Sequence, residues 1–240
     1  MTIEFIGLPG VGKSYICRRL FEVCEPPGGA EAIHVAPAAE DQRRVAHLAA
    51  KLHRATLFLL RHPLVTGRIL HCVGRSAQKS SLEAVFKAVN LLSELQAVDR
   101  TQGVSVIDQG VLQAIWSVLL RGRNCQDERR FLELVRPWLP SVVIFVVAER
   151  EENIRRLRTR LNGQSRIDGL PAGEIEAELI RGTNLLEQIF KEWKEVVSDG
   201  RELRVVNQGD FSPSMVASLL PELLSREATL HQAVFADRRG

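Results

Sequence analysis

The sequence carries the stretch GLPGVGKS at residues 7–14, and this stretch decides the fold. It matches in full the pattern G-x-x-x-x-G-K-[ST] of a loop that cradles the phosphates of a nucleotide. An apolar alternating segment precedes it at residues 2–6, and a helical pattern with Ile16, Leu20 and Val23 follows it. Because the pattern requires a strand before the loop and a helix after it, the sequence predicts a nucleotide-binding loop here.

The residue types in this loop suit phosphate binding. Glycines tolerate positive φ and let backbone amides close around phosphate oxygens, while the start of the next helix offers free N–H groups. Lys13 would place its charge on the β and γ phosphates, and the hydroxyl of Ser14 would bind Mg²⁺. We therefore expect ATP and Mg²⁺ as cofactors, with contacts from Gly7, Pro9, Gly10, Val11, Gly12, Lys13, Ser14 and Tyr15.

Short segments rich in Val and Ile alternate with longer helical patterns along the chain. We expect strands at residues 2–6, 32–36, 104–108, 142–148 and 203–207. We expect helices at about residues 12–24, 41–60, 80–98, 111–121, 128–135, 151–161, 173–197 and 213–224. Strands that alternate with helices indicate a parallel sheet covered on both faces, which makes the fold class α/β. The apolar run at residues 142–148 is typical of a central strand.

The connection at about residues 37–103 is too long for one crossover helix. It must hold several helices, with a break near Arg61-His62-Pro63, because a proline ends or kinks a helix. Such a helical insertion often covers the ligand of a sheet enzyme, although we expect most of its residues to complete the core. Since the sequence contains no repeat and no clear linker, we expect residues 1–240 to form a single domain.

Composition and charge exclude several classes of protein. The 240 residues include 32 basic and 29 acidic side chains, and the resulting net charge of +3 argues against binding nucleic acid through overall charge. The apolar runs are far shorter than the roughly 20 residues of a membrane span, and the start MTIEFIG lacks the features of a signal peptide. The four cysteines and six histidines show no metal-ligand spacing. We expect a cytoplasmic protein with reduced thiols and no membrane partner.

The segment VSVID at residues 104–108 is an apolar strand that ends in an acid. Asp108 would hold Mg²⁺ or accept a proton from an attacking hydroxyl, because the strand ends of such a sheet face the ligand crevice. The competing interpretation is that Asp108 caps the helix expected from Val111. Gln109 stands where ATP-hydrolysing motors usually carry a glutamate, which weakens an assignment as a motor.

The segment at residues 149–166 carries six arginines and three acids, so its net charge of +3 equals that of the whole chain. Helical periodicity places Arg155 and Arg158 on one flank and Arg156 and Arg160 on the other. Arginines on a helix that runs into a loop can fold over bound phosphates and stabilise a transferring group. The alternative is a solvated charged face with some affinity for nucleic acid.

Four stretches resemble the nucleoside and nucleotide kinases of the P-loop class, including thymidylate-kinase-like members. They are GLPGVGKS, SVIDQG, VVIFVVAEREENIRRLRTRLNGQSRID and RVVNQGDFSP, and the resemblance extends over about residues 1–225. It implies a three-layer α/β/α sandwich around a five-stranded parallel sheet, with ATP–Mg²⁺ as phosphoryl donor. It also implies an arginine-rich lid at about residues 149–170, with Arg156 and Arg160 and with Arg166 as a further candidate. The chain departs from the family at Gln109, where family members commonly carry arginine, so the resemblance does not identify the acceptor.

These observations favour an ATP-dependent phosphotransferase that moves the γ-phosphoryl group of ATP–Mg²⁺ to a small molecule, such as a nucleoside, nucleotide or sugar. The expected catalytic residues are Lys13, Asp108, Arg156 and Arg160, and the expected Mg²⁺ ligands are Ser14 and Asp108. Weaker candidates for acceptor contacts are Arg43, Arg44, Arg75 and Gln109.

Two other functions stay open. One is a nucleotide-dependent regulatory ATPase, or switch, that engages a protein partner. The other is a nucleic-acid- or protein-binding module whose phosphate loop is vestigial. The sequence also leaves a homodimer open, and it does not distinguish ATP from GTP.

Overall fold

A computed structural model describes residues 1–23, 41–76, 80–101, 103, 105–120, 128–159 and 170–207, without the side chains of residues 19–23, 41–45 and 172. The strands are β1 (Thr2–Ile6), β2 (Ser105–Ile107), β3 (Val142–Val147) and β4 (Arg201–Val206). The helices are α1 (Lys13–Val23), α2 (Asp41–Arg61), α3 (Pro63–Arg75), α4 (Ser81–Arg100), α5 (Val111–Leu119), α6 (Glu128–Leu134), α7 (Arg150–Thr159) and α8 (Ala172–Val196). A short 3₁₀ helix, η1 (Arg136–Trp138), precedes β3.

The described strands form one parallel sheet in the order β2-β1-β3-β4. β3 is an interior strand, as the apolar run at residues 142–148 predicted. β4 begins at Arg201, two residues before its predicted start, because the N–H of Arg201 donates to the Ser141 carbonyl at 2.9 Å and extends the pairing with β3. Four of the five expected strands are therefore confirmed. The strand expected at residues 32–36 and the helix expected at residues 213–224 lie outside the described residues.

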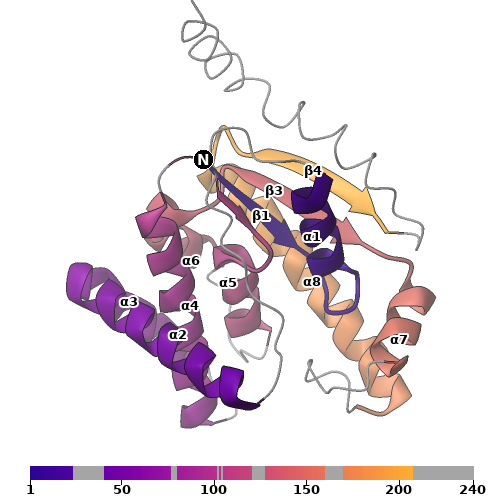
Figure 1. Ribbon diagram of the computed structural model, residues 1–240, viewed down its shortest axis with the longest axis horizontal. Coiled ribbons are helices and arrows are strands. Elements are labelled where there is room, and N and C mark those ends of the chain that lie inside the picture. The colour runs from indigo at the N-terminus through magenta and orange to yellow at the C-terminus, as the bar shows by residue number, and fades with distance from the viewer. Residues whose placement is uncertain are drawn as a thin grey trace, which may run out of the picture.

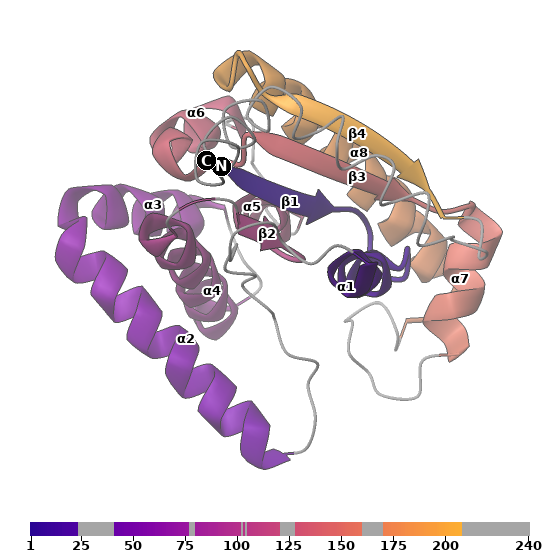
Figure 2. The same cartoon turned by 45° about the horizontal axis from the view of Figure 1, so that its top comes forward.

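Helices cover both faces of the sheet, as Figures 1 and 2 show. α1 lies on one face, where Ile3 and Phe5 of β1 pack with Ile16. α4, α5, α6 and α8 pack on the opposite face, toward which Val143 and Phe145 of β3 point. These layers confirm the α/β/α sandwich, and they bury β1 and β3 on both sides, which explains why both strands are almost continuously apolar.

The helical insertion packs as α2 and α3 against α4 (Figure 2). The break predicted at Arg61-His62-Pro63 is confirmed, since α2 ends at Arg61 and α3 begins at Pro63. Proline is tolerated at the first position of a helix, because the N–H that it lacks would have no partner within the helix there. The sequence did not define α3 as a separate range, because its glycines and β-branched residues give it low helix propensity. Burial of its residues Ile69 and Val73 in the core shared with α4 stabilises it instead.

α2 and α4 run in the same direction. Lys51 of α2 donates to the side chain of Asn90 in α4. Ten residues further along α2, Nη1 of Arg61 lies 3.5 Å from Oδ2 of Asp99, which is nine residues further along α4. α4 leads through a short connection into β2, so α4 runs opposite to the strands of the sheet. The N-terminal ends of α2 and α4 therefore point toward the carboxyl edge of the sheet.

α8 is the longest described helix, at 25 residues, and it packs against Leu8 in the loop that follows β1. Trp116 of α5 donates its indole N–H to the carbonyl of Gly182 in α8 at 3.0 Å. A Cβ on Gly182 would lie 2.9 Å from Cδ2 of Leu8 and 3.1 Å from the indole of Trp116. Because glycine has no side chain, Gly182 lets α8 pack closely against Leu8 and Trp116. No helix in the described ranges combines the length and apolar character needed to cross a bilayer.

Replacing Gly182 with Val should lower the free energy of unfolding by about 1–3 kcal/mol, because the added side chain must displace Trp116 and Leu8. The matched control is Gly67→Val in α3, where a Cβ would meet nothing within 4 Å, and there we expect a change within about 0.5 kcal/mol. Chemical denaturation followed by circular dichroism measures both. A Gly182→Val protein as stable as the wild type would contradict the close packing of α8.

Candidate nucleotide-binding site

The predicted phosphate-binding loop lies at the carboxyl end of β1 and leads directly into α1 (Figure 2). Gly10 and Gly12 have φ values of 91° and 92°, which residues with a Cβ rarely adopt. A Cβ on Gly10 would lie 2.2 Å from Oδ1 of Asn153, and one on Gly12 would lie 2.3 Å from Nδ2 of Asn207. Both glycines are therefore required by the turn and by the close approach of α7 and the end of β4.

Lys13 lies inside the loop. Its side chain is buried, and its ammonium group donates to the carbonyls of Gly7 at 2.6 Å and Leu8 at 3.0 Å. The sequence predicted that this lysine would act on phosphates bound by the loop. The structure places its charge among the loop's own backbone groups.

The other predicted loop residues divide into two groups. Ser14 and Tyr15 are exposed in the first turn of α1. The side chain of Val11, in contrast, is buried in the core between α1 and the sheet, so only its backbone faces the loop. Pro9 is half-buried and lies between Gly7 and Gly10. The chemistry available to a ligand therefore comes from backbone groups, Lys13 and the Ser14 hydroxyl.

Asp108 follows β2 directly and lies near the start of α1. Burial, and to a smaller extent the negative charge of Asp108, raise the pKa of the Cys17 thiol in α1 to about 12. Oδ1 of Asp108 is buried and has no hydrogen-bond partner among the described residues. A hydroxyl and a carboxylate are oxygen donors of the kind that Mg²⁺ prefers, so Ser14 and Asp108 fit the predicted metal.

The alternative role of Asp108, as a cap for α5, is wrong. The N-cap of α5 is Gly110, and the N–H groups of Leu112 and Gln113 donate to Oε2 and Oε1 of Glu4 at 3.1 and 2.8 Å. Sequence reasoning missed Glu4. Its signal is an acid in the middle of the otherwise apolar strand TIEFI, at a position that the sheet buries.

The Glu4 carboxyl is almost completely buried, at 1% exposure. Burial raises its pKa to about 7, the charge of Glu94 on α4 acts in the same direction, and the N–H groups of α5 oppose the shift. The pKa of Glu4 in the folded protein therefore lies above its ordinary value of 4.5. Its contribution to stability is full below about pH 4.5 and is lost as the pH rises through about 7.

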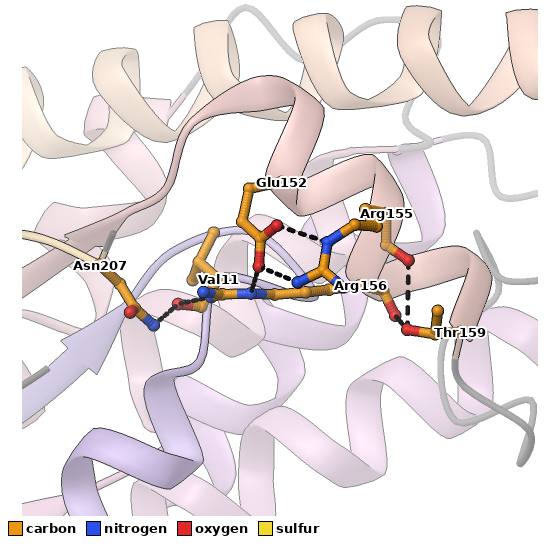
Figure 3. Close-up of polar contacts among 6 residues, drawn as sticks. All are labelled: Val11, Glu152, Arg155, Arg156, Thr159 and Asn207. Atoms are coloured by element: carbon orange, nitrogen blue, oxygen red, sulfur yellow. Dashed lines mark hydrogen bonds and ion pairs between the residues drawn. The ribbon is translucent and has the colours of Figure 1, made fainter. Parts of the chain in front are cut away.

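Arg156 of α7 reaches the loop from the side (Figure 3). Its Nε donates to Glu152 at 2.6 Å, and its Nη1 donates to the carbonyl of Val11 at 3.4 Å. Arg155 binds the same glutamate at 2.6 and 2.7 Å, but its side chain is 66% exposed, whereas that of Arg156 is 21% exposed. Hydrogen bonds from both arginines lower the pKa of Glu152 to about 2. Arg160 and Arg166 lie outside the described residues.

Three amide side chains from other elements hold the loop. Asn207, directly after β4, donates to the Val11 carbonyl at 2.7 Å, and Gln113 of α5 accepts from the N–H of Gly7 at 3.3 Å. Asn153 of α7 is buried against Gly10. Sequence reasoning assigned none of these roles, although Asn207 lies in the stretch RVVNQGDFSP that supported the resemblance.

The weaker candidates for acceptor contacts are less closely connected to the loop. Gln109 is exposed and adjoins Asp108, so the chain itself brings it to the carboxyl edge of the sheet. Arg75 is exposed in the last turn of α3. The side chains of Arg43 and Arg44 lie outside the described residues.

No family model and no curated protein matches this chain. Its fold is similar to that of a deoxyadenosine kinase from M. mycoides, solved with the products dCMP and a flexible dCDP, at 13% identity and a TM-score of 0.52. That match covers 94% of this chain and 99% of the kinase. A thymidylate kinase from Candida albicans matches at 16% identity and a TM-score of 0.50, over 95% of this chain and 92% of that chain.

At such low sequence identity, the similarity to these structures shows the fold alone. The matches extend over nearly the whole length of both partners. The chain therefore has the fold of the P-loop nucleoside and nucleotide kinases.

Proposed function

We propose that this protein is an ATP-dependent phosphotransferase of the nucleoside and nucleotide kinase type. The observation that carries the proposal is a complete phosphate loop, with Lys13 inside it, that meets an acid from β2 and an arginine from α7 at one edge of the sheet. Charge of both signs at a loop built for phosphates suits the transfer of a phosphoryl group, which needs positioning and electrostatic stabilisation. The similarity in fold to two kinases agrees with this assignment.

In this proposal the loop and Lys13 hold the donor. Backbone N–H groups of residues 10–14 and the positive end of α1 would surround the β and γ phosphates, and the Lys13 ammonium would transfer its hydrogen bonds from Gly7 and Leu8 to phosphate oxygens. Ser14 and Asp108 would hold Mg²⁺, which neutralises part of the nucleotide charge when bound. Asp108 is also the group that can accept the proton of an attacking hydroxyl.

Arg156 then stabilises the transferring group. Glu152 holds the guanidinium beside Val11, so the arginine needs little rearrangement to meet charge that develops at the end of the loop. Arg160, and Arg166 as a further candidate, would join it from a lid at about residues 149–170.

The acceptor would lie between Asp108 and the insertion at about residues 37–103. The N-terminal ends of α2 and α4 point toward that edge of the sheet, and Gln109 adjoins it. We propose a nucleoside, nucleotide or sugar as the acceptor, with Arg43, Arg44, Arg75 and Gln109 as candidate contacts. We also propose that residues 1–240 form one domain that carries this insertion and lid.

The test is a screen for phosphoryl transfer from labelled ATP–Mg²⁺ to nucleosides, nucleotides, sugars and small alcohols. Lys13→Ala should lower transfer at least about 10²-fold, because it removes the charge placed on the transferring group. Lys191→Ala, an exposed lysine on α8, is the matched control and should leave the rate unchanged. If no acceptor is labelled and hydrolysis appears only with a protein partner, the regulatory ATPase replaces the kinase as the function.

Arg156→Ala should lower kcat by about 10²- to 10³-fold with a smaller change in KM for ATP, since its charge acts on the transition state more than on bound ATP. Arg155→Ala is a close control because Arg155 lies on the same helix and binds the same glutamate, yet its side chain is 66% exposed, against 21% for Arg156. We expect its kcat within about twofold of the wild type. Steady-state kinetics measure both, and equal losses in the two variants would argue against the assigned role.

The outer surfaces of α2 and α3 support the further proposal of a homodimer. Leu60 and Leu64, on either side of the break between the helices, are 72% and 82% exposed. Other exposed leucines on these helices are Leu48, Leu52, Leu59 and Leu70. Exposed apolar side chains gathered on adjacent helices mark interaction surfaces. Residues 42–82 contain no acid, so two copies that met here would face each other with like charge.

This arrangement predicts a dimer that tightens as salt is added, because counterions screen the repulsion while apolar contacts remain. Leu60→Ser combined with Leu64→Ser should raise the dimer dissociation constant at least about tenfold. Ile180→Ser on α8, an apolar site outside α2 and α3 that is 46% exposed, should not change it. Sedimentation equilibrium at two salt concentrations measures the constant, and a monomer under both conditions would rule out the dimer.

A further inference from the structure

Glu4 connects the two sides of the proposed active site. It is the strand residue paired with Ile107, which directly precedes Asp108, and it lies three residues before Gly7. Its side chain projects onto the face of the sheet that α5 covers. A single buried carboxylate therefore lies near the carboxyl ends of both β1 and β2. The phosphate loop follows the first of these strands, and Asp108 follows the second.

Both oxygens of this carboxylate hold the start of α5. Oε1 accepts from Gln113 and Oε2 accepts from Leu112, so the anion takes the place of the side-chain cap that Gly110 cannot supply. The contact is close, since a Cβ on Gly110 would lie 2.7 Å from Oε2 of Glu4. The turn from Asp108 to Gly110 is thus held at one end by β2. At its other end it is held by α5, whose first turn is hydrogen-bonded to Glu4 of β1.

The same helix start reaches the phosphate loop. Gln113, whose N–H is held by Glu4, accepts from the N–H of Gly7 through its side chain at 3.3 Å. The carbonyl of Gly7 in turn accepts from Lys13 at 2.6 Å. A continuous set of hydrogen bonds therefore runs from Glu4 through the first turn of α5 to the lysine of the loop.

The ionised carboxylate is costly to the fold. Burial and the charge of Glu94 both disfavour it, which is why the pKa of Glu4 rises to about 7. The other groups around it are backbone N–H groups of α5, and no described cation is among the causes of the shift. An apolar residue at this strand position would cost less, so the benefit of Glu4 lies in what it holds in place.

We infer that Glu4 is a positioning residue that fixes the distance between Asp108 and the phosphate loop. The inference rests on the proposed phosphotransferase function. Glu4 touches no reacting atom in it, and acts by holding the helix start to which both groups are attached. A displacement of about 1 Å between catalytic groups can lower a rate about 10²-fold, so an anchor shared by both sides of the site has a large effect.

The test is Glu4→Gln, which keeps the size of the side chain but presents an NH₂ group to an N–H of α5. We expect kcat for transfer from ATP–Mg²⁺, to the best acceptor of the screen, to fall about 10- to 10²-fold at pH 8. KM for ATP should stay within about threefold, because the loop glycines and Lys13 are unchanged. The Mg²⁺ concentration that gives half of the maximal rate should rise, since Asp108 is displaced.

Stability separates positioning from a purely structural role. Between pH 5 and pH 8 the folding constant of the wild type should fall by about two orders of magnitude relative to Glu4→Gln, because the variant lacks the carboxyl with the raised pKa. A variant that loses kcat while keeping or gaining relative stability supports the inference. Equal kcat in the two proteins overturns it.

Two further variants complete the experiment. Glu94→Gln removes the neighbouring charge and keeps the two hydrogen bonds between Glu4 and α5, and its kcat at pH 8 should lie within about twofold of the wild type. If Glu4→Gln does not fold, Gly110→Ala is used as the test variant. Its methyl group would push the turn away from an intact Glu4. An unchanged kcat in Gly110→Ala overturns the inference. If the wild type itself transfers no phosphate to any acceptor, the proposed function fails, independently of Glu4.

Discussion

The parallel pairing of β1 with both β2 and β3 is the constraint on which the rest of the structure depends. Because all strands run the same way, every carboxyl end lies at one edge of the sheet. The loop after β1, Asp108 after β2, α7 after β3 and Asn207 after β4 are brought together there, although they are as much as 200 residues apart in the chain. Antiparallel pairing would have sent half of these groups to the opposite edge.

The phosphate loop owes its shape to its neighbours as much as to its own glycines. Gln113 of α5 accepts from the N–H of Gly7, while Asn153 of α7 and Asn207 after β4 occupy the space that side chains at Gly10 and Gly12 would need. Amides suit this role because each offers both a donor and an acceptor without a charge that would compete with phosphate. The loop conformation is therefore a property of the assembled sheet, and the local sequence motif alone does not determine it.

Local patterns in the sequence predicted the elements and the loop well, because a complete phosphate-loop motif and apolar periodicity are read over a few residues. They could not reveal partners that meet only through folding. The acid in TIEFI has no visible partner until α5, more than 100 residues later, is packed beneath β1. The same separation hid Asn207 and led to the wrong alternative that Asp108 caps α5. α3 was not defined because packing on α4, which the sequence does not show, outweighs its poor helix propensity.

The position of Lys13 has a consequence for how the loop discriminates among solutes. Its ammonium is already coordinated by the carbonyls of Gly7 and Leu8, so any incoming anion competes with the loop itself. A neutral or singly charged solute offers too little to replace two short hydrogen bonds of a buried cation. Only a ligand with several charged oxygens close together can offset that exchange. In the proposed function the resting loop would thus act as a charge threshold, which abundant small anions such as chloride would not pass.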